Sequence, residues 1–332
     1  MLGTAPGSGA TGVTLPPEPL AEYERVPVPT ATADQLQAVV ERHGLELDGP
    51  ITPISTAGVV HALWRLGSQW VLRVPKNEEM CLGDHRCEAI AIPLARSAGV
   101  RTPALIAFDD SAEIFEVPYS IVEHVDGTNL VGLRPADPRY DATYRQLGEQ
   151  LALLHGASVP DAPHPWLRVP DDRPAEDLFD EVREAGLLHD DGISWIRGLC
   201  EQLDARIMGE APARRVFLHD DVKPDNLMVD LRGDVHLIDW GDAGYGDAAY
   251  DFQSVPLRAV RAALVSYRTL APGDPALEAR IVRRILARAL VGLRRTPRLG
   301  PSWYRPIAAT LTDVLAFVGD FPVDWSEWTN GR

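Results

Sequence analysis

The sequence has few of the features that mark membrane, disulfide-stapled or secreted proteins. It contains no run of about 18 apolar residues, which argues against a membrane-spanning helix. Its N-terminus lacks the basic start and apolar stretch of a secretory signal. The cysteines Cys81, Cys87 and Cys200 are too few and too scattered for a disulfide framework or a zinc motif. We therefore expect a cytoplasmic protein that does not associate with membranes.

Lysine is also scarce, because Lys76 and Lys223 are the only two in the chain. The 32 basic residues face 48 acidic ones, and the formal net charge is −16. This charge argues against a nucleic-acid partner, since such proteins need a basic surface to offset phosphates. It suits a cationic small-molecule partner, because carboxylates that line a cleft concentrate counter-ions. Solubility alone is the competing explanation for the charge.

Patterning predicts an α+β protein with three parts. Residues 1–30 are rich in Gly, Pro, Thr and Ala and predict a flexible N-terminal arm. Residues 31–126 predict a small β-rich lobe, with strands at 51–54, 62–66, 69–74, 104–108 and 119–123 and helices at 33–46 and 88–98, the second interrupted by Pro93. Residues 127–332 predict a larger, mainly helical lobe, with helices at 144–155, 175–188, 193–208, 255–270, 277–294 and 306–318.

One β-rich stretch of the helical part carries polar residues at fixed offsets. It contains His219-Asp220-Asp221-Val222-Lys223-Pro224-Asp225-Asn226 and, further on, Ile238-Asp239-Trp240-Gly241-Asp242. Apolar runs flank the first segment, and the turn residues 230–234 between the two segments predict a hairpin. The hairpin would bring Asn226 and Asp239 close together, with Asp221 at the mouth.

Phosphoryl transfer from a nucleotide needs these residue types. Asn226 and Asp239 offer the hard oxygen ligands that Mg²⁺ prefers. Asp221 offers a carboxylate that orients an acceptor hydroxyl and accepts its proton. Lys223 offers a cation that can offset charge on the transferring phosphoryl group. The segment therefore predicts kinase chemistry.

The paired motif His-x-Asp-x-x-x-x-Asn and Ile-Asp-Trp-Gly-Asp resembles that of the aminoglycoside phosphotransferase and choline-kinase-like family. The resemblance implies the two-lobed protein-kinase-like fold and a reaction that uses ATP or GTP with Mg²⁺. It implies that Asp221 is the catalytic base, that Asn226 and Asp239 bind Mg²⁺, and that His219 braces the catalytic loop. It also implies that Asp251 braces the same loop from the start of a helix.

The N-terminal part resembles the nucleotide-binding lobe of the same family. The turn Ser55-Thr56-Ala57-Gly58 resembles the loop that covers the nucleotide, whose backbone amides cradle phosphates. Arg73 occupies the place of the lysine that anchors the nucleotide in protein kinases, and Glu88 that of its carboxylate partner. In the segment that resembles the adenine-binding hinge, Glu123 is implied to offer its carbonyl and Val125 its amide.

The resemblance extends over residues 51–252 and has departures. Asp220 replaces the arginine with which phosphorylation-controlled protein kinases grip their activation loop. Asp239 and Asp251 are also too close in sequence for a long activation loop. Both departures disfavour a regulated protein kinase.

The acceptor stays open, with three alternatives. The first is an antibiotic kinase that acts on an aminoglycoside; the second is a kinase of a macrolide, a metabolic sugar or an amino alcohol; the third is a kinase-fold binding protein without turnover. Acidic residues that either meet cationic groups or form a solvated helix face lie at Asp171, Asp172, Glu176, Asp177, Asp180, Glu181 and Glu184. Trp325 and Trp328 either close a sugar site or pack against the helical lobe.

Overall fold

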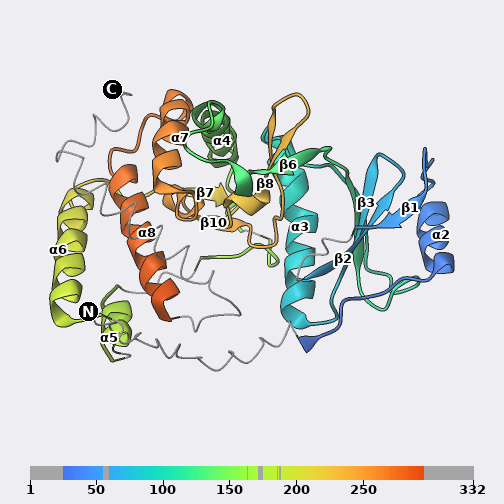
Figure 1. Ribbon diagram of the computed structural model, residues 1–332, viewed down its shortest axis with the longest axis horizontal. Helices are drawn as coiled ribbons and strands as arrows, with labels where there is room; N and C mark the ends of the chain where they lie inside the picture. Colours follow the sequence, from blue (N-terminus) through green and yellow to red (C-terminus); the bar gives the residue numbers. More distant parts are fainter. Residues whose placement is uncertain are drawn as a thin grey trace, which may run out of the picture.

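The structure is a computed structural model that describes residues 25–54, 60–162, 164–170, 175–184, 186 and 188–294. These residues form a β-rich N-terminal lobe, on the right of Figure 1, and a larger, mainly helical C-terminal lobe on the left. The arrangement confirms the predicted two-lobed α+β architecture. Among the described helices, none combines the length and the apolar character needed to cross a bilayer.

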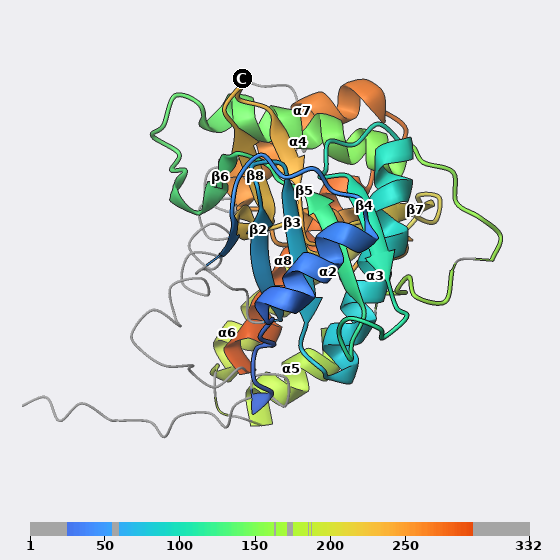
Figure 2. The same cartoon turned by 90° about the vertical axis from the view of Figure 1, so that its right-hand side faces the viewer.

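The N-terminal lobe is built on an antiparallel five-stranded sheet in the order β1-β2-β3-β5-β4. The strands are β1 (Ile51–Pro53), β2 (His61–Leu66), β3 (Trp70–Pro75), β4 (Leu105–Asp109) and β5 (Tyr119–Glu123). Helix α2 (Ala33–Arg42) begins at a capping box of Thr32 and Gln35 and lies across one face of the sheet (Figure 2). On β3, Leu72 and Val74 are buried in the N-terminal core and Val71 packs against the other core, as the alternation of side chains along a strand requires.

Helix α3 (Glu79–Ser97) is longer than the sequence predicted. It begins nine residues before Glu88, where the Glu78 side chain accepts a hydrogen bond from the Cys81 backbone amide. The prediction that Pro93 interrupts this helix is wrong, since the helix continues through it. A proline inside a helix costs about 3 kcal/mol. Burial of the flanking side chains of Ile92 and Ala95 in the core shared with the C-terminal lobe offsets that cost.

The C-terminal lobe is organised around the pair α4 and α7, which pack directly against each other. Its helices are α4 (Tyr140–His155), α5 (Ala175–Glu184), α6 (Asp190–Ile207), α7 (Leu257–Leu270) and α8 (Leu277–Arg294). Gly148 of α4 permits the close approach, because a Cβ there would lie 1.9 Å from the backbone oxygen of Ala263 on α7. The predicted helix at 306–318 and the predicted arm at 1–30, apart from residues 25–30, lie outside the described residues.

Short strands at the boundary of the two lobes hold the polar segments. They are β6 (Gly127–Asn129), β7 (Arg215–Leu218), β8 (Leu227–Asp230), β9 (Val235–Leu237) and β10 (Gly244–Asp247). The predicted hairpin is confirmed, because β8 pairs with β9 in antiparallel register. The pairing of β6 with β8 and of β10 with β7 was not predicted. Residues 219–226 thus lie between β7 and β8, and residues 238–242 lie between β9 and β10.

Candidate active site

The Asp251 side chain holds the start of the 219–226 segment through backbone amides of that segment. Its two carboxylate oxygens accept hydrogen bonds from the backbone amides of His219, at 3.1 Å, and Asp220, at 2.6 Å. The ring Nε2 of His155 lies 3.0 Å from the same carboxylate. Asp251 is fully buried in the 3₁₀ turn Ala248–Phe252. The brace that the sequence implied for Asp251 is therefore present.

His219 connects the two polar segments. Its Nε2–H donates to the carbonyl of Ile238 at 2.9 Å, and its Nδ1 accepts from the backbone amide of Asp221 at 3.3 Å. The ring is fully buried and lies against Trp240, with ring centroids 4.5 Å apart. One imidazole therefore fixes the backbone of Asp221 relative to the residue that precedes Asp239.

The Asp221 carboxylate is oriented by two donors. Its Oδ2 accepts from Lys223 Nζ at 2.5 Å and from Asn226 Nδ2 at 2.8 Å. Asn226 Nδ2 also donates to the Asp221 carbonyl at 3.0 Å. Since the amide nitrogen of Asn226 is committed to Asp221, its Oδ1 is the atom left to ligate a metal ion.

Asp239 approaches the nucleotide-anchoring pair that the sequence implied. Arg73 on β3 donates to Glu88 on α3 at 2.6 Å, and the same guanidinium nitrogen lies 3.9 Å from Asp239 Oδ1. Asp239 has a φ of 69°, in the left-handed region that aspartate tolerates better than most residues. The structure thus brings Arg73, Glu88, Asp221, Asn226 and Asp239 to one place between the lobes.

Several carboxyl groups at this place have raised pKa values. Burial raises the pKa of Glu88 to about 8, against the opposing effect of Arg73, and Asp239 adds to the rise. Burial also raises the pKa of Asp242, where Asp221 and Asp239 add to the rise. Burial is the largest cause of both rises, and the neighbouring carboxylates add to them. A divalent cation held by Asn226 and Asp239 would lie beside these carboxyl groups and would favour their ionised forms.

Arg168 forms two ion pairs in this region that the sequence did not predict. Its guanidinium pairs with Asp84 on α3 and, at 2.8 Å, with Asp242, three residues after Asp239. Gly241 permits this approach, since a Cβ there would lie 2.8 Å from Cβ of Asp84. The sequence motif includes Asp242, but Arg168 and Asp84 lie far from it in the sequence and belong to no sequence motif.

The remaining predicted site residues are only partly accounted for. Glu123 is the last residue of β5, and Val125 lies in the link between β5 and β6. Ser55, Thr56 and Gly58 lie outside the described residues.

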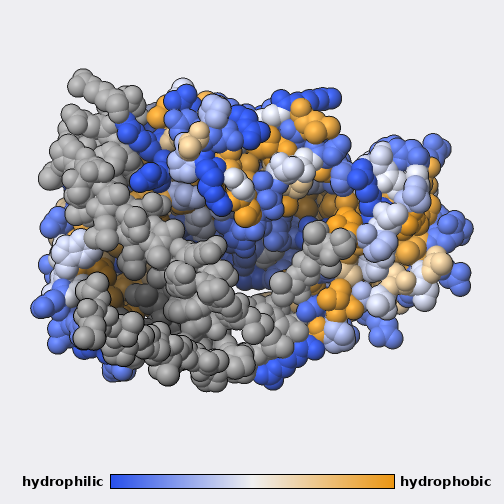
Figure 3. Space-filling view, in the orientation of Figure 1, coloured by the Kyte–Doolittle hydropathy of each residue, from blue (hydrophilic) through white to orange (hydrophobic). Residues whose placement is uncertain are grey.

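A recess with a hydrophilic wall opens between the two lobes in the space-filling view (Figure 3).

Some of the acidic residues proposed to meet a cationic acceptor lie within the described residues. Asp177, Asp180 and Glu184 are exposed on α5, whose opposite face buries Leu178 and Val182. Asp180 also pairs with Arg183 at 2.7 Å. This geometry is that of a solvated helix face. Outside the described residues lie Asp171, Asp172, the side chain of Glu176, Trp325 and Trp328.

Asp220 provides a test of the charge crowding. Burial raises its pKa to about 8, and the carboxylates of Asp251 and Asp242 add to the rise. Its pKa in an unfolded chain is about 3.9. Between these values the folded state retains a proton that the unfolded state has lost, so stability falls as the pH rises from about 4 to 8.

Asp220→Asn is therefore expected to raise the melting temperature by several degrees at pH 8 and by much less at pH 5. Asparagine tolerates the φ of 61° at this position and can still accept the hydrogen bond from Gln253. Thermal unfolding of both proteins at pH 5, 6, 7 and 8 measures the difference. A difference that does not change with pH would contradict the burial of a protonated carboxyl group.

Comparisons with known proteins agree with this architecture. The sequence pattern of the family described as "Phosphotransferase enzyme family" matches residues 56–281. No curated protein sequence matches the chain. The structural likenesses that follow have low sequence identity and support the fold alone.

Three solved structures illustrate the likeness. The streptomycin–ATP complex of APH(2'')-IIa is 16% identical, with a TM-score of 0.53 over 80% of this chain and 90% of that chain. The GDP complex of aminoglycoside 2'-phosphotransferase-IIIa is 16% identical, with a TM-score of 0.56 over 87% and 99%. A choline/ethanolamine kinase family protein from Mesorhizobium loti is 17% identical, with a TM-score of 0.54 over 89% and 98%.

Proposed function

The chain belongs to the phosphotransferase enzyme family, and from that premise we propose that it transfers the γ-phosphoryl group of ATP or GTP to a hydroxyl group of a cationic small molecule. An aminoglycoside-type antibiotic is the acceptor that we favour. The observation that carries the proposal is the Asp221 carboxylate, held by Lys223 and Asn226 next to the oxygen ligands of Asn226 and Asp239.

Mg²⁺ is the cofactor in this proposal, and Asn226 Oδ1 and the Asp239 carboxylate are the groups that would hold it. The donor set fits, because both groups are hard oxygen ligands and the amide nitrogen of Asn226 is already bonded to Asp221, which leaves its oxygen for the ion. When bound, Mg²⁺ neutralises charge on the phosphate oxygens of the nucleotide. Arg73, held by Glu88, supplies a further cation for those oxygens.

Asp221 acts as the base in this mechanism. Its Oδ2 accepts both side-chain hydrogen bonds, and in the described part of the chain none reaches Oδ1. Oδ1 therefore receives the acceptor hydroxyl and takes its proton as the hydroxyl oxygen forms the new bond to the γ-phosphorus. The bond from that phosphorus to the β–γ bridging oxygen breaks in the same step, and the nucleoside diphosphate leaves. Because Asp251 and His219 fix the backbone of the loop, the carboxylate is oriented before the substrate arrives.

Two observations support a cationic acceptor. The formal net charge of −16 favours capture of a cation, and carboxyl groups crowd the site. Streptomycin, bound in the APH(2'')-IIa complex, is an aminoglycoside. The likeness to a choline/ethanolamine kinase family protein favours an amino alcohol as the second candidate. Both acceptors carry a hydroxyl group and a positive charge. One of the similar solved structures is a GDP complex, and we therefore retain GTP as well as ATP as a candidate phosphoryl donor.

An acceptor panel tests the proposal. The purified chain is incubated with Mg²⁺ and ATP or GTP, and release of nucleoside diphosphate is followed with aminoglycosides, amino alcohols, macrolides, tuberactinomycins and neutral sugars. We expect stimulation by aminoglycosides and not by neutral sugars of similar size. Stimulation by neutral sugars alone would overturn the cationic-acceptor proposal, stimulation by macrolides alone would overturn the aminoglycoside as acceptor, and stimulation by amino alcohols alone would favour the second candidate.

Lys223→Met is expected to lower kcat by about 10–100-fold with little change in the KM for nucleotide. The reason is that Lys223 contacts Asp221 directly and offers its charge at the reacting end of the site. Steady-state kinetics with a saturating acceptor measures the effect. Lys223→Arg keeps the charge and should retain more activity than Lys223→Met, and equal loss in both variants would contradict a role for the charge.

A further inference from the structure

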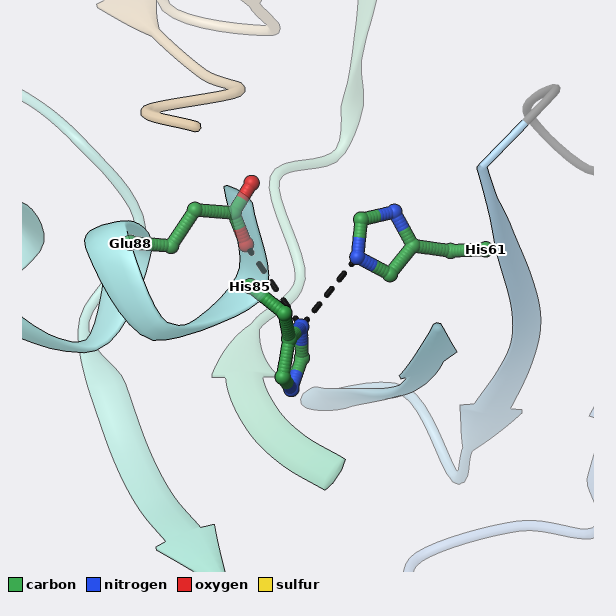
Figure 4. Close-up of side chains that lie close together, drawn as sticks. All are labelled: His61, His85 and Glu88. Carbon is green, nitrogen blue, oxygen red and sulfur yellow. Dashed lines mark hydrogen bonds and ion pairs between the residues drawn. The ribbon is translucent and has the colours of Figure 1, made fainter. Parts of the chain in front are cut away.

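A buried group of three side chains in the N-terminal lobe includes Glu88, the partner of Arg73. It consists of His61, the first residue of β2, and of His85 and Glu88 on α3. Figure 4 shows the three side chains converging from these two elements, with the His85 ring between the other two. His85 is fully buried, and His61 and Glu88 are 6% and 2% exposed.

The contacts of this group leave polar atoms without partners. His61 Nε2 lies 3.1 Å from His85 Nδ1, which is one hydrogen bond shared by two rings. His85 Nδ1 lies 4.0 Å from Glu88 Oε2. Glu88 Oε2 has no hydrogen-bond partner within the described residues, because Oε1 is the atom that pairs with Arg73. A buried carboxyl oxygen without a partner is costly and calls for an explanation.

We propose that His61, His85 and Glu88 form a structural binding site for a divalent transition-metal ion, with Zn²⁺ as the ion that the ligands fit best. Two imidazole nitrogens and one carboxylate oxygen are a ligand set typical of Zn²⁺. Mg²⁺ does not suit the site, because it prefers oxygen ligands only.

The ligand spacing fits this assignment. One ligand atom from each side chain lies within 4.8 Å of the others. Two ligands at about 2.0–2.1 Å from a tetrahedral Zn²⁺ are about 3.3 Å apart. The 3.1 Å between the imidazoles matches that spacing, and the 4.0 Å between His85 Nδ1 and Glu88 Oε2 must shorten by about 0.7 Å.

The protonation of the two rings is also suitable. Burial lowers the pKa of His85 to about 3 and the pKa of His61 well below its ordinary value, with Arg73 adding to both shifts. Both imidazoles are therefore neutral at physiological pH, which is the form that binds metal. The proton that the rings share moves to the outer nitrogen of the ring that carries it, so both facing nitrogens become ligands. Water completes the coordination.

The Arg73 cation opposes a metal ion at this place. Glu88 offsets this repulsion, because it lies between the two cations. Its Oε1 pairs with Arg73, and its Oε2 would bind the metal. The Asp239 carboxylate near Arg73 reduces the repulsion further. The metal would tie the start of β2 to α3 and leave the Arg73–Glu88 pair intact.

Metal binding by the full chain, without nucleotide, tests the proposal. After removal of metals with a chelator, Zn²⁺ affinity is measured by competition with a chromophoric chelator, and Co²⁺ is used as a spectroscopic probe of nitrogen and oxygen coordination. We expect one Zn²⁺ per chain with a Kd below about 1 μM. Zn²⁺ at one equivalent should raise the melting temperature by several degrees, whereas Mg²⁺ should not compete with it for this site.

The double variant His61→Leu, His85→Leu removes two ligands and replaces a hydrogen-bonded pair by apolar groups, which the fold tolerates best when both partners change together. Its Zn²⁺ affinity should fall at least about 100-fold. His236→Gln and Cys81→Ser are matched controls that remove a ligand-type side chain elsewhere and should bind Zn²⁺ as the parent does. Failure of the parent to bind Zn²⁺, or equal affinity in the double variant, would overturn the site.

Discussion

Asp221→Asn is expected to lower kcat for phosphoryl transfer by about 10²–10⁴-fold while the Kd for Mg²⁺-nucleotide stays within about threefold of the parent value. The amide keeps the size of the carboxylate and can still accept a hydrogen bond, but it cannot take the acceptor's proton. Nucleotide affinity is preserved, because Arg73 and Asp239 remain in place. Steady-state turnover and calorimetric titration with a nucleotide measure the two quantities separately.

Asp225→Asn is the matched control for this variant. Asp225 lies in the same loop, one residue before Asn226, but its side chain is exposed. The same chemical change there should leave kcat within about twofold of the parent, as expected for an exposed surface substitution. If Asp221→Asn retained full turnover, or if both variants lost activity equally, Asp221 would not be the base.

Asp239→Asn is expected to lower kcat/KM by about 10²–10³-fold and to remove most of the Mg²⁺ dependence of nucleotide binding. Asp239 is the only carboxylate of the proposed Mg²⁺ ligand pair, so its amide form leaves the ion without a charged protein ligand. Asparagine tolerates the φ of 69° at this position, which keeps the backbone unchanged. Calorimetric titration with nucleotide, at several Mg²⁺ concentrations, measures the dependence directly.

Asp234→Asn serves as the control for that variant. Asp234 is about half exposed and lies at the turn of the same hairpin, 4.0 Å from Arg101. Nucleotide binding by Asp234→Asn should keep the Mg²⁺ dependence of the parent. If Asp239→Asn kept it as well, the ion would be held elsewhere and the proposed ligand pair would be wrong.

The sequence predicted best the parts of the site that are local. Asp221, Asn226 and Asp239 belong to two segments joined by one hairpin, and turn chemistry and strand alternation determine that geometry over about twenty residues.

The sequence did not predict contacts between distant segments. Arg168 of the C-terminal lobe pairs with Asp84 of the N-terminal lobe. His61 on β2 forms a hydrogen bond with His85 on α3. No periodicity relates such residues, since the packing of whole elements brings them together. Helix α3 shows the same limit, because its burial against the C-terminal lobe carries it through Pro93, which local propensity alone treats as a break.

Transfer of a labelled γ-phosphoryl group tests the central claim most directly. The full chain, in excess over nucleotide labelled at the γ-phosphate, is mixed with Mg²⁺ and the acceptors that stimulate turnover, and the label is followed for a single turnover. We expect the label to move to an acceptor hydroxyl with the parent and to stay in the nucleotide with Asp221→Asn. Label that remains in bound nucleotide, or leaves only as inorganic phosphate with the parent and every acceptor, would contradict it.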